Sequence, residues 1–215
     1  AAGRTRRECR GDRRQGRRAA GISQGLTLAF QPSDLRLKAA VRVLEAGNLV
    51  ACPTEAVWGL SCDPDNPDAV TRLLQLKQRP VEKGLILVAA SASQLGFLLA
   101  DLEPQLASRL TGSWPGPNTW LVPHRGRVRP WVHGSHDTVA VRVSDHPVVR
   151  ALCLAWGGPL VSSSANPAGA RPPNAGFQVR RYFGSDLVAL LPGSVGDSAR
   201  PSTIRDLATG QIIRA

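Results

Sequence analysis

The sequence predicts a single α/β domain built on a twisted, mostly mixed β-sheet flanked by helices. Three observations lead to this fold class. The chain has 215 residues, of which 42% are hydrophobic and 20% are charged, a composition typical of a globular domain with a sizeable core. Helical and strand-like patterns alternate from residue 34 onward. No internal repeat or change of composition interrupts this alternation, so we expect one domain over residues 31–215.

The helices are predicted from the spacing of apolar residues and from the residues at their ends. Asp34 is suited to cap the first helix, and Gly47-Asn48 is suited to stop it. In the second helix, apolar residues recur three and four positions apart. The predicted helices are residues 35–46, 67–77, 93–100, 104–110, 147–156 and 175–183.

The strands are predicted from short apolar or alternating runs between turn residues. Leu85–Ala90 is a continuous apolar run, which is typical of a buried strand, whereas Thr138–Val143 alternates. The segment 124–136 is basic and is expected to be a loop. The predicted strands are residues 49–52, 85–90, 119–122, 138–143, 159–162, 187–191, 202–206 and 211–213. In such folds ligands bind at strand ends, so the chemistry is sought there.

Much of the net charge of +11 lies at the N-terminal end of the chain. The first twenty residues hold eight arginines and two acidic residues, without apolar periodicity and without the apolar core of a secretory signal. We therefore expect residues 1–30 to be a basic extension that is either disordered or not native. A nucleic-acid-binding arm is the alternative interpretation of the same arginines.

The sequence lacks the signatures of several protein classes. No run approaches the roughly 18 apolar residues of a membrane-spanning helix. The patterns of the phosphate-binding loop, the dinucleotide fold and the zinc proteases do not occur. The four cysteines show no CxxC spacing, which favours a reducing compartment, here the cytoplasm. We expect no metal site at His133 and His136, because Gly134 lies between them and no further ligand is near.

The run Pro53–Gly59 directly follows the predicted strand 49–52. Pro53 is expected to end the strand pairing, so that Thr54 and Glu55 project from a rigid corner. An ordinary turn, in which both side chains bond to backbone groups, is the alternative.

The segment Lys77–Gly84 lies between a predicted helix and an apolar strand. Lys77, Arg79 and Lys83 place three cations within seven residues, in a loop stiffened by Pro80. Arginine offers a planar fork to phosphate oxygens and lysine adds a mobile point charge, so the loop is suited to a polyphosphate. The alternative is that the cations only complement the dipole of the preceding helix.

The segment Ser162–Pro167 follows the predicted strand 159–162. If the chain stays extended, Ser162, Ser164 and Asn166 present two hydroxyls and an amide on one side. These groups can bind a small zwitterion and a nucleotide without adding charge. A polar turn explains the same composition.

Five segments, taken in order, resemble the YrdC/TsaC family of threonylcarbamoyl-AMP synthases. They are Pro53–Gly59, Lys77-x-Arg79-Pro80, Trp114-Pro115-Gly116-Pro117-x-Thr119, Ala140-Val141-Arg142 and Ser164-Ala165-Asn166. The resemblance runs from about Leu35 to Arg214 and implies a YrdC-like domain with a concave basic substrate cleft. Because no room is left for the C-terminal domain of longer members, we expect the short bacterial form.

The resemblance implies an enzyme, a nucleotidyltransferase that converts L-threonine, bicarbonate and ATP into L-threonylcarbamoyladenylate, pyrophosphate and water. The product supplies the threonylcarbamoyl group for the adenosine beside the anticodon of tRNA. ATP is then a substrate, Mg²⁺ is expected to arrive with it, and no permanently bound cofactor is expected. The expected partners are the tRNA-modifying proteins that use the product. Weak binding of tRNA or other RNA stays an open alternative, and no membrane is expected to be involved.

The resemblance also implies roles for individual residues. Lys77 and Arg79 are expected at the carbamate and the phosphates as catalytic residues, and Arg142 is expected at the threonine carboxylate. Thr54, Ser162 and Ser202 are expected to line the threonine side. The residues expected on the ATP side are Lys83, Thr138, Ser164, Asn166 and Arg214.

The sequence departs from the family pattern in two places. Position 58 is Trp where many members carry Tyr or Phe, so no phenolic hydrogen bond is expected there. Pro167-Ala168-Gly169 replaces a more usual hydroxyl-bearing stretch, so we expect a smaller contribution from it to ATP binding.

Two other functions are consistent with parts of the sequence. A basic face centred on Arg125, Arg127 and Arg129 would bind RNA without catalysis. A carbamoyl-adenylate-forming domain of the hydrogenase-maturation type is the other alternative. Such domains lie in larger chains with zinc-finger and acylphosphatase segments, which this sequence lacks.

Overall fold

The computed structural model describes Ala1 and residues 32–186, 189–198 and 202–214. The described residues form helices around one mixed nine-stranded sheet, which confirms the predicted fold class. The α-helices are α1 (Asp34–Glu45), α2 (Pro67–Lys77), α3 (Gly96–Leu99), α4 (Pro104–Thr111), α5 (Pro130–His133), α6 (Pro147–Trp156) and α7 (Gly176–Phe183). The short 3₁₀ helices are η1 (Val81–Lys83), η2 (Ala92–Leu95) and η3 (Gly184–Asp186). The strands are β1 (Val50–Pro53), β2 (Trp58–Cys62), β3 (Ile86–Ala89), β4 (Asn118–Pro123), β5 (Thr138–Val143), β6 (Leu160–Ser164), β7 (Ala189–Leu190), β8 (Thr203–Asp206) and β9 (Ile212–Arg214).

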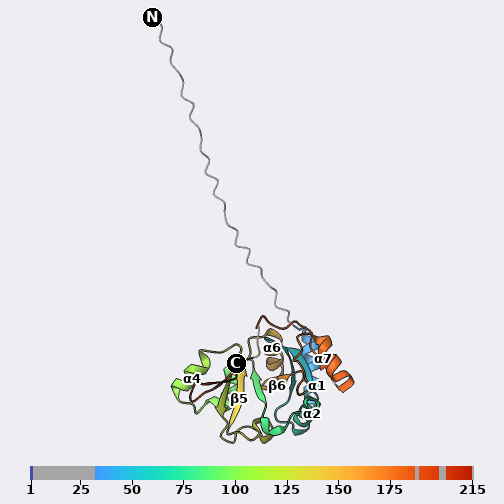
Figure 1. Ribbon diagram of the computed structural model, residues 1–215, viewed down its shortest axis with the longest axis horizontal. Coiled ribbons are helices and arrows are strands. Elements are labelled where there is room, and N and C mark those ends of the chain that lie inside the picture. The colour runs from blue at the N-terminus through green and yellow to red at the C-terminus, as the bar shows by residue number, and fades with distance from the viewer. Residues whose placement is uncertain (2–31, 187–188, 199–201, 215) are drawn as a thin grey trace.

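The strand order of the sheet is β7-β1-β2-β6-β3-β5-β4-β8-β9. Three neighbouring pairs are parallel, namely β1 with β7, β3 with β5 and β4 with β8, and the other pairs are antiparallel. In Figure 1, α4 lies toward one end of the domain, and α1, α2 and α7 lie toward the other. The sheet therefore joins segments that are far apart in the sequence, including β2 with β6 and β4 with β8.

Two apolar clusters cover the opposite faces of the sheet. Side chains alternate along a strand, so Val50 and Cys52 of β1 belong to one cluster and Ala51 belongs to the other. Leu44 of α1 and Leu152 of α6 pack in the first cluster. The second cluster includes buried residues of α2, α4, α5 and α7. Burial on both faces makes the sheet a rigid support for the residues at its surface.

The ends of helix α2 follow from its sequence. The side chain of Asn66 accepts hydrogen bonds from two N–H groups of the first turn, and Pro67 supplies the fixed φ of a first helical position. Gln78 adopts a left-handed conformation, with φ of 49°, and ends the helix. Lys77 is therefore the last helical residue, and Arg79 lies in the loop that follows.

Several predicted bounds are confirmed, namely the helices 67–77 and 147–156 and the strand 138–143. The strand β2 was not predicted. The pairing of β1 ends at Pro53, as expected, although Pro53 itself is the last strand residue and lies opposite Trp58. The N–H of Trp58 donates to the carbonyl of Pro173 at 2.8 Å, and the chain turns only at residues 54–57. A proline is tolerated there because the carbonyl of Trp58, which cannot receive an N–H from Pro53, accepts from the N–H of Ala165 at 2.8 Å.

Two further segments differ from the expectations. Strand β6 continues to Ser164. Ser162, Ser163 and Ser164 are therefore strand residues and do not form the polar turn that was the alternative interpretation. The predicted loop 124–136 contains the short helix α5, which begins at Pro130. Apart from Ala1, the predicted extension 1–30 lies outside the described residues, as do positions 187 and 188 of a predicted strand. Within the described ranges, no helix has the length and apolar character needed to cross a membrane.

Candidate active site

A cavity of about 410 Å³ lies on one face of the sheet. Its volume falls in the range of small-molecule sites. Strand register places side chains from four neighbouring strands in one row across its floor. The row consists of Ser162 of β6, Ile86 of β3, Ala140 of β5 and Leu121 of β4. The cavity is therefore built on the rigid middle of the sheet.

Nine of the eleven predicted site residues line this cavity. They are Thr54, Arg79, Lys83, Thr138, Arg142, Ser162, Ser164, Ser202 and Arg214. The structure thus brings together residues from both ends of the domain. Lys77 and Asn166 do not line the cavity.

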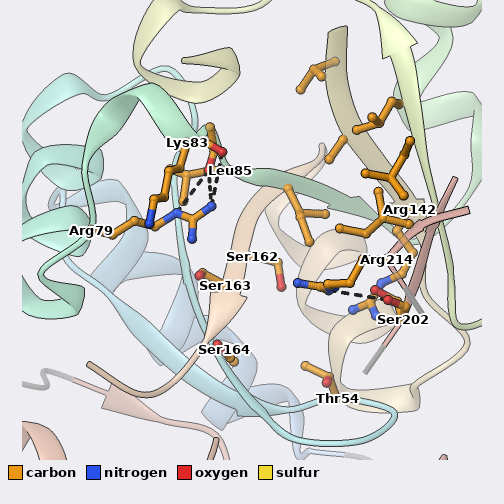
Figure 2. A pocket seen from close by; sticks show the side chains of 18 of the residues that line it. Thr54, Arg79, Lys83, Leu85, Arg142, Ser162, Ser163, Ser164, Ser202 and Arg214 are labelled. Atoms are coloured by element: carbon orange, nitrogen blue, oxygen red, sulfur yellow. Dashed lines mark hydrogen bonds between the residues drawn. The ribbon is translucent and has the colours of Figure 1, made fainter. Parts of the chain in front are cut away.

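Cations lie in two groups around the cavity, as Figure 2 shows. Arg79 and Lys83 form one group, and Arg142 and Arg214 form the other, with Ser162 between them in this view. The guanidinium of Arg79 is fixed because its Nη2 donates to the carbonyls of Gly84 at 2.9 Å and Lys83 at 3.2 Å. Burial, and then the charge of Arg214, lower the pKa of Arg79 from its usual value. An anion bound in the cavity would relieve this repulsion.

The two cations of the second group differ in burial, since Arg142 is buried and Arg214 is exposed. Arg142 is only 7% exposed, and its Nη2 lies 3.3 Å from the Oε2 of Glu55. The Nη2 of Arg214 donates to the backbone carbonyl of Ser202 at 3.4 Å. Arg142 therefore has fixed surroundings, and both guanidinium groups retain donors for a ligand.

The hydroxyl groups at the cavity differ in how far they are engaged. The Oγ1 of Thr54 donates to the carbonyl of Val57 at 2.7 Å, within its own turn. The Oγ of Ser202 accepts from the hydroxyl of Thr119 at 2.8 Å. In the described part of the chain, no hydrogen bond is found for the hydroxyls of Ser162 and Ser164. The same holds for Ser163 and Thr138, which also line the cavity, so these four hydroxyls are available to a ligand.

Lys77 occupies a buried position behind the cavity wall. Its Nζ donates to the carbonyl of Asn166 at 2.9 Å and to that of Ser164. Burial, and then the charge of Arg79, lower the pKa of Lys77 from 10.5 to about 8. The ammonium thus joins the end of α2 to the end of β6.

Asn166 does not lie on the same side as Ser162 and Ser164, contrary to the extended path that was expected. The N–H of Asn166 bonds to the carbonyl of Ser164 at 2.9 Å, so the chain turns there. Its Nδ2 donates to the carbonyls of Pro167 at 3.0 Å and Ala170 at 2.7 Å. The turn directs two carbonyls toward Lys77, and the Asn166 amide stabilises the following loop.

Other residues at the cavity had no predicted role. Glu55, whose run was recognised in the sequence, lines the cavity and contacts Arg142. His133 and His136 also line it. The ring of His133 stacks on that of His124 with centroids 3.8 Å apart. His133 is the last residue of α5 and reaches the cavity through the packing of that helix. No local pattern in the sequence predicts this packing.

The cavity offers little to a metal ion. Within the described residues, no three His, Cys, Asp or Glu side chains are grouped so as to bind one. Glu55 is the one carboxylate of the described residues that lines the cavity, and it already contacts Arg142 and Ser144. The donors present are suited to anions and hydroxyl groups.

Fold and cavity together define a class of protein: a mixed α/β domain whose sheet carries a cation-lined cavity suited to a small anionic ligand. Comparison with known proteins identifies the family. The Sua5/YciO/YrdC family model, described as "Telomere recombination", matches residues 42–215. The chain belongs to this family.

Close relatives cover most of the chain. The threonylcarbamoyl-AMP synthase of Saccharophagus degradans is 59% identical over 180 residues, which are 84% of this chain and 94% of that protein. The threonylcarbamoyl-AMP synthase of Pseudomonas aeruginosa strain PAO1 is 58% identical over 182 residues, 85% of this chain and 98% of that protein.

Solved structures share the fold. P. abyssi Sua5 complexed with L-threonine superimposes with a TM-score of 0.78 at 29% identity, over 84% of this chain and 53% of that chain. The chain thus spans about half the length of P. abyssi Sua5. E. coli YciO has a TM-score of 0.75 at 22% identity, over 86% of this chain and 93% of that chain, and T. kodakarensis HypF has a TM-score of 0.68 at 16% identity, over 83% and 23%. These last two show the fold alone.

Proposed function

We propose that this protein is a threonylcarbamoyl-AMP synthase, a nucleotidyltransferase that makes L-threonylcarbamoyladenylate, pyrophosphate and water from L-threonine, bicarbonate and ATP. The observation that carries the proposal is the 59% identity to the S. degradans synthase over 94% of that protein's length. The cavity supports it, because cations and free hydroxyls surround a space of about 410 Å³.

The chemistry requires positioning more than a protein nucleophile. The amine of threonine takes up CO₂ from bicarbonate, which releases water, and becomes a carbamate. A carbamate oxygen then attacks the α-phosphorus of ATP, and the bond to pyrophosphate breaks. Negative charge must be held close together throughout, so cations fixed around the reactants lower the barrier.

Arg142 is the proposed ligand of the threonine carboxylate. It is buried at the floor of the cavity, and a guanidinium can bind a carboxylate with two parallel hydrogen bonds. Thr54, Ser162 and Ser202 would line the side chain and amine of threonine. The L-threonine complex of P. abyssi Sua5, a protein 29% identical to this chain, supports a threonine site in this domain.

Arg79 and Lys83 are proposed to bind the phosphates and the carbamate. The fixed guanidinium of Arg79 provides a preorganised cation, and Lys83 adds a second charge in the same group. Thr138, Ser164 and Arg214 would contribute on the nucleotide side. For Lys77 and Asn166, the contacts favour support of the β6 end from behind, because their polar groups bond to backbone carbonyls.

Mg²⁺ is proposed to enter bound to the phosphates of ATP. The single carboxylate found at the cavity among the described residues, Glu55, is paired with Arg142, so the chain supplies no evident set of ligands of its own. When bound, the ion would neutralise phosphate charge. The chain's own part would be to hold the phosphate oxygens with Arg79 and Lys83.

The proposal is tested by measuring pyrophosphate release from the full chain with threonine, bicarbonate, ATP and Mg²⁺. We expect release that needs all three substrates and that falls at least about 100-fold in Arg142→Ala, since a buried charged hydrogen-bond donor is lost. Arg129→Ala is the matched control, because Arg129 pairs with Asp65 at the surface and lies outside the cavity lining. Pyrophosphate release that continues without threonine would overturn the assignment.

The two alternative functions receive less support. Arg125 and Arg127 both pair with Asp101, and Arg129 pairs with Asp65 at 2.7 Å, so the cluster that favoured RNA binding is largely neutralised. The hydrogenase-maturation type shares the fold of HypF at 16% identity, which is a likeness of fold only. Activity with carbamoyl phosphate in place of threonine and bicarbonate would favour that type.

We also propose partner proteins and a compartment for this protein. Because an acyl-adenylate is reactive, the proteins that transfer its threonylcarbamoyl group to tRNA are the proposed partners. Cys52, Cys62 and Cys153 are buried free thiols, which supports a reducing compartment such as the cytoplasm.

A further inference from the structure

Glu55 is a buried carboxylate at the cavity to which no role has been given. It lies in the four-residue turn between β1 and β2, is 7% exposed, and lines the cavity. A carboxylate so far removed from water must be compensated by charge or by hydrogen bonds. Its contacts therefore indicate what it does.

One oxygen of Glu55 is anchored to the chain just after β5. The Oε1 atom accepts from the hydroxyl of Ser144 at 2.7 Å and from the N–H of Asp145 at 3.2 Å. The backbone around Glu55 is fixed on the other side, since the carbonyl of Glu55 accepts from the N–H of Ser198 at 3.1 Å. The side chain thus has one well-determined orientation.

The other oxygen faces Arg142. The Oε2 atom lies 3.3 Å from Nη2 of Arg142, which is the distance of an ion pair, but no hydrogen bond to Oε2 is found among the described residues. The side chains of both partners are 9% exposed. At such burial the attraction between the charges is strong, and removal of one charge leaves the other uncompensated.

Arg142 needs this partner to stay oriented. Its Nε is buried, and no hydrogen bond to another described residue is found for that atom. Without the carboxylate, a guanidinium in this place would be an isolated buried cation and would turn toward water. The ion pair leaves the guanidinium donors available to a second carboxylate.

We propose that Glu55 is a positioning residue that holds Arg142 in the orientation that binds the threonine carboxylate. This inference rests on the proposed function. Glu55 acts through Arg142 and does not touch the reacting atoms, because Oε2 is buried away from solvent. Its effect falls on threonine binding and leaves ATP binding and the chemical step intact.

Glu55→Gln separates this role from a merely structural one. The amide oxygen of glutamine still accepts from Ser144 and Asp145, whereas the negative charge facing Arg142 is lost. Calorimetric titration of the full chain should give a Kd for threonine that rises about tenfold or more, with the Kd for ATP unchanged. Steady-state pyrophosphate release should show the same rise in KM for threonine at an unchanged kcat.

Two further variants make the test decisive. Asp101→Asn removes a surface partner of Arg127 outside the cavity and should change neither constant. In an Arg142→Lys background, Glu55→Gln should have a much smaller effect, because the partner on which it acts has been altered.

The outcomes distinguish the two proposals. Wild-type protein that fails to bind threonine would overturn the proposed function. Wild-type protein that binds threonine while Glu55→Gln binds it equally well would overturn the positioning role alone. So would a fall in kcat at unchanged KM, which would place Glu55 at the reacting amine, or an equal loss of ATP affinity, which would indicate general damage to the fold.

Discussion

The Nζ of Lys77 bonds to backbone carbonyls of Ser164 and Asn166 at the end of β6, where the sequence pattern predicted contact with substrate. The motif located the right region, because Lys77 is the last residue of α2 and Arg79 lies in the loop that follows. It could not separate their positions, since residues only two apart can point to opposite sides of a wall. Arg79 lines the cavity, and Lys77 supports the strand behind it.

The buried ammonium of Lys77 predicts a pH-dependent contribution to stability. The unfolded chain keeps the proton up to its usual pKa of 10.5, while the folded protein releases it near about 8. Unfolding therefore takes up a proton between these values, and raising the pH through this window stabilises the folded protein. Urea denaturation should show that the free energy of unfolding of the wild type rises relative to Lys77→Met between pH 8 and 10.5. Parallel pH profiles for the two proteins would contradict the buried position of the amine.

Sequence reasoning reached most of the site residues and missed those that depend on long-range packing. Ser162 and Ser164 were accessible because alternation along a strand places them on one face, whereas Arg142 was reached through the family resemblance. The contact of Glu55 with Arg142 joins residues far apart in the chain, and no local sequence pattern in either segment predicts it. The same holds for His133, which reaches the cavity only through the packing of α5.

At the scale of elements, the loop that carries Arg79 and Lys83 is held by the end of α5. The N–H of Leu85 donates to the carbonyl of Val132 at 2.7 Å, and that of Ser135 donates to the carbonyl of Glu82 at 3.2 Å. Gly134 packs directly against this loop: a Cβ there would lie 2.5 Å from the Glu82 carbonyl oxygen. The two segments therefore fit only if residue 134 has no side chain.

Gly134→Ala should consequently disturb both the fold and the ATP side of the cavity. The φ of +65° is unfavourable for alanine, and the added methyl group must displace backbone atoms, so we expect a loss of about 3 kcal/mol or more in the free energy of unfolding. The Kd for ATP should rise, as measured by calorimetry. Gly126→Ala is the matched control, because its φ is +74° with no atom within 4 Å, and it should cost about 1–2 kcal/mol and leave ATP binding unchanged. Equal losses in the two variants would show that the contact with Glu82 is unimportant.

The ends of helices and strands could be predicted where the sequence contains the residues typical of a cap or a turn. The helix 67–77 begins at a proline after an asparagine cap and ends at a left-handed residue, so its limits are local. Strand β2 was missed although Trp58, Leu60 and Cys62 alternate with Gly59 and Ser61. It is only five residues long, and a run that short gives a weak periodic signal.

At the scale of the whole molecule, a mixed sheet could be predicted but its strand order could not. The alternation of helices and strands indicates an α/β domain. The order β2-β6-β3-β5-β4 is decided by pairings between distant segments, which a single sequence does not reveal. The net charge alone does not show which arginines face the cavity. The structure distinguishes the arginines that ion pairs neutralise from those that line the cavity.

The distribution of charge predicts how the full chain responds to RNA. Substitution of Arg125, Arg127 and Arg129 by glutamine should barely change the salt dependence of RNA binding, because these arginines are paired with Asp101 and Asp65. Fluorescence titration against a single-stranded RNA at several salt concentrations provides the measurement. If each arginine contacted a phosphate, the slope of log K against log salt would fall by about 0.7 for each one removed. A drop of that size would revive the RNA-binding alternative.

The cavity joins cations from both ends of the domain, and its arginines repel each other when no anion lies between them. A ligand that binds only the folded form stabilises it by mass action, by about 2.7 kcal/mol at a hundredfold excess over Kd. Cellular proteases act on the opened form, so the half-life of this protein would lengthen when its substrates are plentiful. The cations that bind the reactants would then make the amount of this protein in the cell depend on the supply of its substrates.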